Sequence, residues 1–85
     1  MGSSIIYTGA TIEHDCKIGA HNHLAPGVTL SGGVMTASQV HIGTGASVIQ
    51  NIQIGEQAVI GAGTTVVKNV PAQQTIIPAA SRMLK

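Results

Sequence analysis

A six-residue repeat runs through most of the sequence and restricts the possible folds more than any other feature. Counting in sixes from Ile6, ten of twelve residues are Ile, Val or Leu, and nine of the eleven residues two places earlier are small or medium-sized and apolar. Alternate residues of a strand share one face, so each repeat predicts a short strand with its apolar residues on one side. The first slot contains Ile6, Ile12, Ile18, Leu24, Leu30, Thr36, Ile42, Val48, Ile54, Ile60, Val66 and Ala72.

A turn is predicted between successive strands. The residue that precedes each pair of apolar slots is mostly Gly, Asn or Asp, which tolerate positive φ. One such unit cannot bury its apolar side alone, so the units must coil around a shared axis. Three repeats make one triangular coil, which predicts four coils at about 6–23, 24–41, 42–59 and 60–77. A period of six does not follow one face of an α-helix.

The composition agrees with a narrow interior and excludes several classes of protein. Of the 85 residues 44% are hydrophobic, yet Tyr7 is the only aromatic residue, so no large side chain has to fit inside. A charged fraction of 8% and a net charge of +1 argue against disorder and against nucleic acid as a partner. No apolar run reaches membrane-spanning length, and no secretory signal opens the chain. The single Cys16 fits a reducing compartment, so we expect a cytoplasmic protein without membrane partners.

Several motifs resemble a known family. Ile-Gly begins the hexads at residues 18, 42, 54 and 60, which is similar to the left-handed parallel β-helix of the hexapeptide acyltransferases. The runs T-G-A-T-I-E-H-D-C (8–16), H-L-A-P-G (23–27), L-S-G-G-V (30–34) and I-G-A-G (60–63) resemble the sialic-acid O-acetyltransferases and the nucleotide-sugar 4-amino N-acetyltransferases. The resemblance covers about residues 5–77 and implies an all-β, left-handed parallel β-helix.

The resemblance also implies a chemistry. The family's general base corresponds to His14, the acidic residue that orients it corresponds to Asp15, and a second histidine near the acetyl group corresponds to His23. Acetyl-CoA is then the co-substrate, and an amino or nucleotide sugar is the acceptor. The family's members are homotrimers with sites between subunits, and no metal is expected.

The residues themselves support a site at His14. Imidazole titrates near neutral pH, which suits proton abstraction. The residue stacked on it one coil later is Gly32, which leaves room for a thioester and offers an N–H to its carbonyl oxygen. Gln50 and Lys68 continue this column at coil spacings of about 4.8 Å, so a track ending near a cation is predicted for the pantetheine arm and its phosphates.

Other interpretations remain open for the remaining polar residues. His21 is typical of a turn, and Cys16 of a buried structural thiol. His23 and His41 are one coil apart and should stack as a surface ladder or, alternatively, as a metal pair. His23 and His14 belong to different faces, so they can serve one site only across a subunit boundary.

Two other functions compete with acetyl transfer. A zinc hydratase of the carbonic-anhydrase type shares this kind of solenoid, but it needs three histidines that converge between subunits. A trimeric scaffold without activity needs no site at all.

The sequence departs from the family's pattern in three places. Residues 1–4 resemble a leader, so the family's N-terminal substrate domain is expected to be missing. Thr36 replaces an interior Ile, so its hydroxyl needs a partner and its coil should be the weakest or locally bulged. The tail at 78–85 lacks the glycine of the relatives' closing turn, although Arg82 and Lys85 are further candidates for phosphate contacts.

Overall fold

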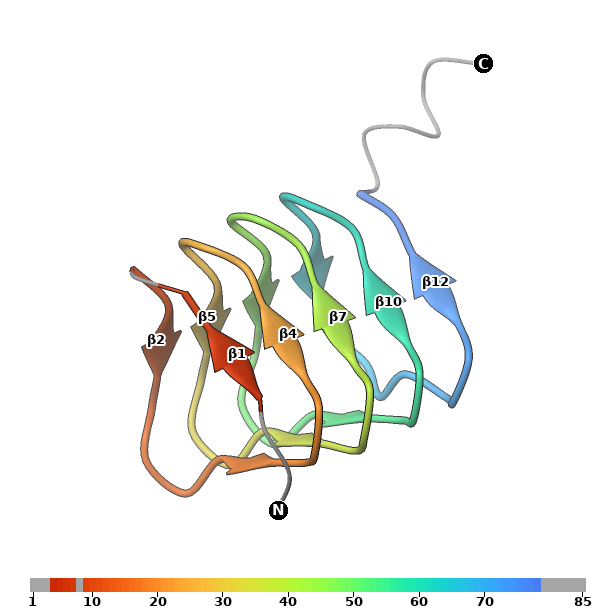
Figure 1. Ribbon diagram of the computed structural model, residues 1–85, viewed down its shortest axis with the longest axis horizontal. Helices are drawn as coiled ribbons and strands as arrows, with labels where there is room; N and C mark the ends of the chain where they lie inside the picture. The colour runs from red at the N-terminus through yellow and green to blue at the C-terminus, as the bar shows by residue number, and fades with distance from the viewer. Residues whose placement is uncertain (1–3, 8, 79–85) are drawn as a thin grey trace.

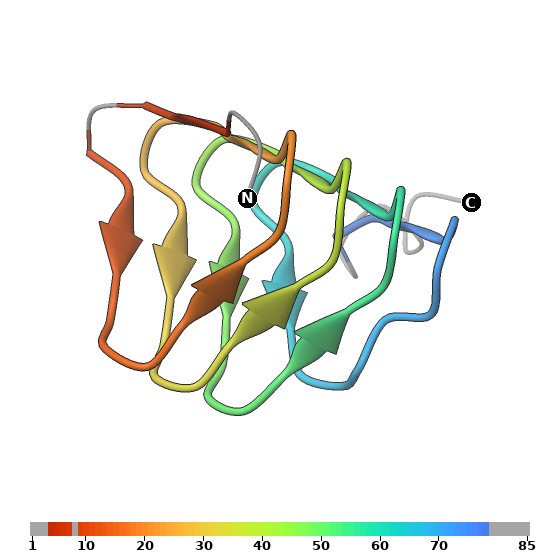
Figure 2. The same ribbon diagram turned by 60° about the horizontal axis from the view of Figure 1, so that its bottom comes forward.

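The computed structural model describes residues 4–7 and 9–78, which form a left-handed parallel β-solenoid of about four turns (Figure 1). Each of the first three coils has three short strands joined by turns, whereas the third side of the fourth coil has only the single bridge of Val70 to Ile54. Figure 2 shows the three sides and the corners between them. Every strand pairs in parallel with the strand one coil away. The fold predicted from the six-residue repeat is therefore confirmed.

The strands are collected into three sheets, one on each side of the solenoid. The five-stranded sheet contains β1 (Ile5–Ile6), β4 (His23–Leu24), β7 (His41–Ile42), β10 (Val59–Ile60) and β12 (Thr75–Ile76). The four-stranded sheet contains β2 (Thr11–Ile12), β5 (Thr29–Leu30), β8 (Ser47–Val48) and β11 (Thr65–Val66). The three-stranded sheet contains β3 (Lys17–Ile18), β6 (Met35–Thr36) and β9 (Gln53–Ile54).

The core is a column of aliphatic side chains along the axis. From β2 to β11, the second residue of each strand and the residue two places before it point inward, as the repeat predicts. The turn slot behaves as predicted as far as Gly63, because its residues adopt positive φ whether they are glycine or not: Asp15, His21, Gln39, Asn51 and Gln57 have φ between 57° and 68°. The prediction is wrong for Asn69, and Gln73 adopts the positive φ of 63° in the last coil instead. The buried hydrophobic residues are Leu24, Val28, Leu30, Val34, Val40, Ile42, Ala46, Val48, Ile52, Ile54, Ala58, Ile60, Val66 and Val70.

The glycine after an interior isoleucine marks a close approach between coils. A Cβ built on Gly43 would lie 2.6 Å from the backbone nitrogen of Ala62 in the next coil. Real Cβ atoms do not come that close, so a side chain at Gly43 would push the two coils apart. This contact gives a physical reason for the Ile-Gly dipeptides of the repeat.

The last coil is shorter than the others. Val59 pairs with His41 in the preceding coil and with Thr75 in the following one, so the sequence separation between register partners falls from 18 to 16. Val70 bridges Ile54 and is buried, and Ala72 is exposed. The phase predicted through Ala72 is therefore wrong after Val66. The larger side chain of Val70 buries more apolar surface in that slot than Ala72 would, which favours the shorter path.

Thr36 is accommodated without a bulge, contrary to one of the two alternatives stated above. Strand β6 stays in register with both of its neighbours. The Thr36 hydroxyl donates to the side-chain oxygen of buried Asn22, whose Nδ2 donates to the backbone oxygens of Ala20 (3.0 Å) and Ala37 (2.8 Å). The partner that this hydroxyl requires is thus a second polar residue inside the solenoid. That this coil is the weakest stays a prediction.

The N-terminal end of the solenoid begins at Ser4. Its hydroxyl donates to the Gly19 carbonyl at 2.9 Å and accepts from the Asn22 N–H at 3.1 Å. Ile5, Ile6 and Tyr7 follow and are exposed, because no coil among the described residues lies on their outer side. Ser4, which the sequence places in a leader, therefore forms part of the first coil's hydrogen bonding.

Candidate functional site

The corner between the four-stranded and three-stranded sheets carries the residues predicted to bind acetyl-CoA. His14, Gly32 and Gln50 each open the turn that follows a strand of the four-stranded sheet, and Lys68 lies in the bend after β11. The Gly33 N–H donates to the His14 carbonyl at 3.4 Å, and the Asn51 N–H donates to the Gly32 carbonyl at 3.0 Å. We call His14, Gly32, Gln50 and Lys68 the corner column.

His14 and Asp15 lie at the N-terminal end of the corner column, and both are exposed. Asp15 has a φ of 68°, so the chain turns sharply directly after His14. Within residues 4–7 and 9–78, no hydrogen bond or ion pair uses either side chain. The imidazole is therefore accessible to solvent and has no competing partner in the described part of the chain.

Gly32 leaves open space next to His14. A Cβ built on Gly32 would meet only the His14 carbonyl oxygen, at 3.6 Å, which is an ordinary contact distance. No backbone hydrogen bond in the described part of the chain uses the Gly32 N–H. The position therefore combines free volume with an available donor, one coil away from the imidazole.

The far end of the corner column differs in character from the end at His14. Gln50 and Lys68 are exposed, and they are flanked by Ile49 and Val67, whose side chains are 40% and 57% exposed. Three coil spacings separate His14 from Lys68, roughly 14 Å along the axis. Along the corner column, ionisable side chains at the end near His14 are therefore followed by exposed apolar side chains and then by the cation of Lys68.

Asn51 is a residue of this corner that the sequence reasoning missed. It follows Gln50 in the turn, and its Oδ1 lies 2.3 Å from the position that a Cβ on Gly33 would take. Gly33 has a φ of 76° and no side chain, so the Asn51 amide folds over it toward the coil that holds His14. Gly33 and Asn51 are one coil apart in the sequence, and this spacing was the signal that could have identified Asn51 as a residue of this corner.

Cys16 lies beside the corner column but faces the interior. Its thiol is half-buried, packs against the core and lies 3.2 Å from the Ser31 carbonyl oxygen, to which it donates. These contacts favour the structural interpretation of this cysteine.

His23 lies on a different side of the solenoid from His14. It is the outward residue of β4 in the five-stranded sheet, where its ring stands between the rings of Tyr7 and His41. The structure therefore does not bring His14 and His23 together within one chain, as expected from their positions in the repeat. Arg82 and Lys85, the other predicted phosphate contacts, lie outside the described residues.

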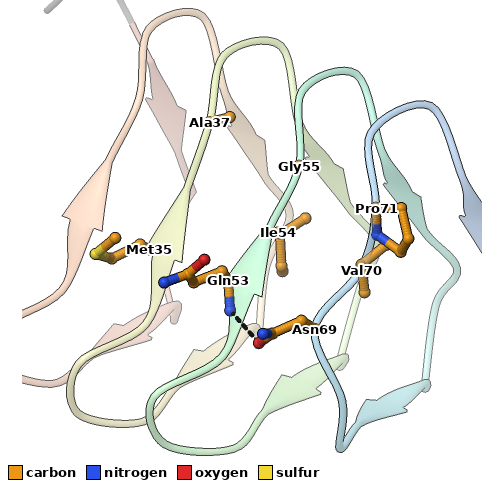
Figure 3. Close-up of a pocket in the computed structure, with 8 residues that line it drawn as sticks. All are labelled: Met35, Ala37, Gln53, Ile54, Gly55, Asn69, Val70 and Pro71. Atoms are coloured by element: carbon orange, nitrogen blue, oxygen red, sulfur yellow. Dashed lines mark hydrogen bonds between the residues drawn. The ribbon is translucent and has the colours of Figure 1, made fainter.

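A hollow of about 420 Å³ opens on the outside of the three-stranded sheet, where the last coil is shortened. Figure 3 shows Met35, Gln53 and Asn69 along one side of it, with the Gln53 N–H donating to the Asn69 side-chain oxygen at 2.8 Å. A second hollow, of about 390 Å³, lies at the last coil and is lined in part by Lys68, Val67 and Ile77. The second hollow adjoins the cationic end of the corner column.

Among the described residues, no three His, Cys, Asp or Glu side chains are grouped so as to hold a metal ion. In the same part of the chain, no helix of a length and hydrophobicity suited to crossing a membrane is found.

Comparison with known proteins points to acetyltransferases. No protein-family model matches the chain, and no curated protein matches it significantly. The solved structure of serine acetyltransferase from Neisseria gonorrhoeae, in complex with serine, is 30% identical over 82% of this chain, with a TM-score of 0.66. Serine acetyltransferase isoform 3 from Entamoeba histolytica, in complex with cysteine, is 24% identical over 85% of this chain, with a TM-score of 0.62.

A third solved structure is a mutant of GDP-perosamine N-acetyl transferase from Caulobacter crescentus in complex with CoA and GDP-perosamine. It is 19% identical over 85% of this chain and 51% of its own, with a TM-score of 0.42. The chain spans 37% and 36% of the lengths of the two serine acetyltransferases.

Proposed function

We propose that this chain, which has the repeat and the left-handed β-helix of the hexapeptide-repeat acetyltransferases, transfers an acetyl group from acetyl-CoA to an amino or hydroxyl group. The observation that carries the proposal is the corner column, which has an accessible imidazole at one end and a lysine at the other. The 30% identity with a serine acetyltransferase supports the same reaction class.

His14 is the general base in this proposal. Its imidazole accepts the proton of the acceptor's hydroxyl or amine as the acceptor's oxygen or nitrogen attacks the thioester carbonyl carbon. The free Gly32 N–H faces the developing negative charge on the carbonyl oxygen. The carbon–sulfur bond then breaks, and the proton held by His14 passes to the departing CoA sulfur. Asp15 orients the imidazole only once the substrates are bound, because the two side chains share no hydrogen bond among the described residues.

The rest of the corner column binds the pantetheine arm and the phosphates. Gln50 offers a side-chain amide to the arm, and exposed Ile49 and Val67 provide apolar contact along the same path. Lys68 is a compact cation beside the second hollow and suits a phosphate group.

The acceptor is an amino or nucleotide sugar in our proposal, which rests on the motif at His14–Cys16 and on the H-L-A-P-G run. Serine, the ligand of one structural neighbour, also carries both an amine and a hydroxyl group. Both acceptor classes need the same base, so the chemistry at His14 does not depend on which of them binds.

The complete site requires more than one copy of the chain in this proposal. His23 lies on another side of the solenoid from His14, so it reaches the acetyl group of a neighbouring copy's site in a homotrimer. The exposed apolar residues near the corner column, Met35, Ile49 and Val67, gain a partner in the same assembly.

The first test is calorimetric titration of acetyl-CoA into the wild-type chain and the Gly32→Ala variant. An added methyl fills the space beside His14, yet its nearest neighbour would be 3.6 Å away, and Ala20 and Ala62 open equivalent turns in the wild type. We expect about one site per chain, and binding weakened on the order of tenfold or more in Gly32→Ala.

Ser38→Ala is the matched control, because Ser38 opens a turn at a different corner. It should bind acetyl-CoA as the wild type does. A folded trimer that does not bind acetyl-CoA would contradict the proposal and favour a scaffold.

The second test separates binding from chemistry. His14→Gln should keep acetyl-CoA affinity within a few-fold but lose acetyl transfer to amino sugars or serine by roughly a hundredfold or more, since general-base catalysis contributes that much. Equal transfer rates in the wild type and His14→Gln would remove His14 from the mechanism.

A further inference from the structure

Two histidines stack on the outer face of the five-stranded sheet, away from the corner column. His23 and His41 are register partners in the parallel pair of β4 and β7. Their ring centroids are 5.2 Å apart, and the ring planes differ by 16°. The ring of Tyr7 lies 5.1 Å from the ring of His23 on the opposite side from His41, so it limits how far His23 can move toward the N-terminal end.

The ring nitrogens of both histidines are available to a ligand. Within residues 4–7 and 9–78, no hydrogen bond uses either imidazole, and neither forms an ion pair. His41 is exposed and His23 half-buried, so solvent reaches the pair. The other outward strand residues on this face are Ile5, Val59 and Thr75, none of which is charged. No cation among these outward strand residues therefore repels a bound metal ion.

We propose that His23 and His41 together bind one late first-row divalent cation, of the class of Ni²⁺, Cu²⁺ and Zn²⁺. Neutral imidazole is the commonest protein ligand for these ions. Each ring supplies one nitrogen, and water completes the coordination. The inference does not depend on acetyl transfer, but a metal ion on this pair would compete with the role proposed above for His23 in a neighbouring copy's site.

The rings must leave their stacked arrangement to bind one ion. Metal–nitrogen bonds of about 2.0–2.1 Å in a tetrahedral site place two ligand nitrogens roughly 3.3 Å apart. The ring centroids are 5.2 Å apart and the ring planes are nearly parallel, whereas a metal ion lies close to the plane of each imidazole that binds it. The rings must therefore rotate out of the stack and turn one nitrogen each toward a common point. The exposed His41 ring makes most of this movement, because Tyr7 already contacts His23.

Calorimetric titration with Ni²⁺ tests the site, because Ni²⁺ does not oxidise the Cys16 thiol. We expect one ion per chain in the wild type, and binding weakened on the order of tenfold or more in both His41→Gln and His23→Gln. His21→Asn is the matched control: it removes an exposed histidine two positions before His23, where the φ of 57° is one that Asn tolerates. This variant should bind as the wild type does.

Three results would overturn the proposal. One is the absence of Ni²⁺ binding by the folded wild-type chain, and another is equal affinity in the wild type and His41→Gln. The third is an equal loss in His21→Asn, which would assign the binding to histidines in general. Tyr7→Phe and Cys16→Ser should leave the affinity unchanged, which distinguishes the imidazole pair from a phenol or thiol ligand. Circular dichroism of each variant verifies that the solenoid is intact.

Discussion

The regular coils and the shortened last coil differ in their length, in how closely neighbouring coils approach and in whether buried hydroxyl groups have a partner. In the regular part, register partners keep a sequence separation of 18, the glycine at position 43 is enclosed by the next coil, and the buried hydroxyl of Thr36 has a partner. In the last coil the separation falls to 16, and a Cβ on Gly61 would come no closer than 3.2 Å to its nearest neighbour. The buried hydroxyl of Thr64 lacks a hydrogen-bond partner in the described part of the chain.

This difference shows which coils must keep the regular coil length and which one is able to depart from it. A coil with neighbours on both sides must keep its length, because each of its backbone groups pairs above and below. The last described coil has a neighbour on one side only, so it can follow a shorter path and bring Val70 into the core. Substitutions matched between the two regions should therefore have unequal effects, which we order from the largest to the smallest.

Truncating an interior isoleucine should show the largest difference. Ile42 is 1% exposed in a middle coil, whereas Ile76 is only partly buried in the last one. Ile42→Ala should lower the free energy of unfolding by about 2–5 kcal/mol, because it removes buried methyl groups and leaves a cavity. Ile76→Ala should cost less than half as much. Urea unfolding at one fixed protein concentration measures both, and equal costs would mean that another chain segment covers Ile76.

Adding a methyl group to the glycine after an isoleucine should give the next largest difference. Gly43→Ala forces the Ala62 backbone away and should cost about 1–3 kcal/mol, as overpacking usually does. The neighbours of Gly61 can give way by a few tenths of an ångström, so Gly61→Ala should cost less than about 1 kcal/mol. Thermal unfolding of the pair compares them directly, and a Gly43→Ala variant as stable as the wild type would refute the close approach of the coils.

Much of this contrast lies beyond what the sequence could predict. The strands, the positive-φ turns and the stacking of His14 with Gly32 all follow from local residue patterns that recur with every hexad and every coil. The shortened coil does not follow from such a pattern, because residues 67–73 still fit the repeat. Val70 and Ala72 compete for one core position, and that competition alone decides which path the chain takes.

Of the buried polar pair Thr36 and Asn22, only the need of Thr36 for a partner was predictable from the sequence. Thr36 in an apolar slot indicated that a partner was needed, but the partner Asn22 lies at a sequence separation of 14. That separation matches neither the hexad nor the full coil, and it depends on how two side chains cross the interior. The roles of His14, Asp15 and the rest of the corner column stay predictions until acetyl-CoA binding is measured.

Replacing the hydroxyl of Thr36 by a methyl group should be destabilising. Thr36→Val leaves the side-chain oxygen of Asn22 without its donor inside the core, where Asn22 is only 2% exposed. An unsatisfied buried acceptor costs about 1–3 kcal/mol. The double variant Thr36→Val with Asn22→Val removes both partners and should recover part of this loss, and the double-mutant cycle gives the coupling energy. A coupling energy near zero would mean that the two side chains do not interact.

The same substitution in the last coil should have a smaller effect of opposite sign. Thr64 is 3% exposed, and the structure gives its hydroxyl no partner among the described residues, so the wild type already bears the cost of desolvating it. Thr64→Val removes that cost, keeps the side-chain shape and should raise the free energy of unfolding by up to about 1 kcal/mol. The neighbouring Thr65→Val, on the exposed outer face, is the control and should change stability by less than about 0.5 kcal/mol. If Thr64→Val proves destabilising instead, the hydroxyl has a partner in the assembled protein, and the last coil is closed by a segment or ligand that satisfies it.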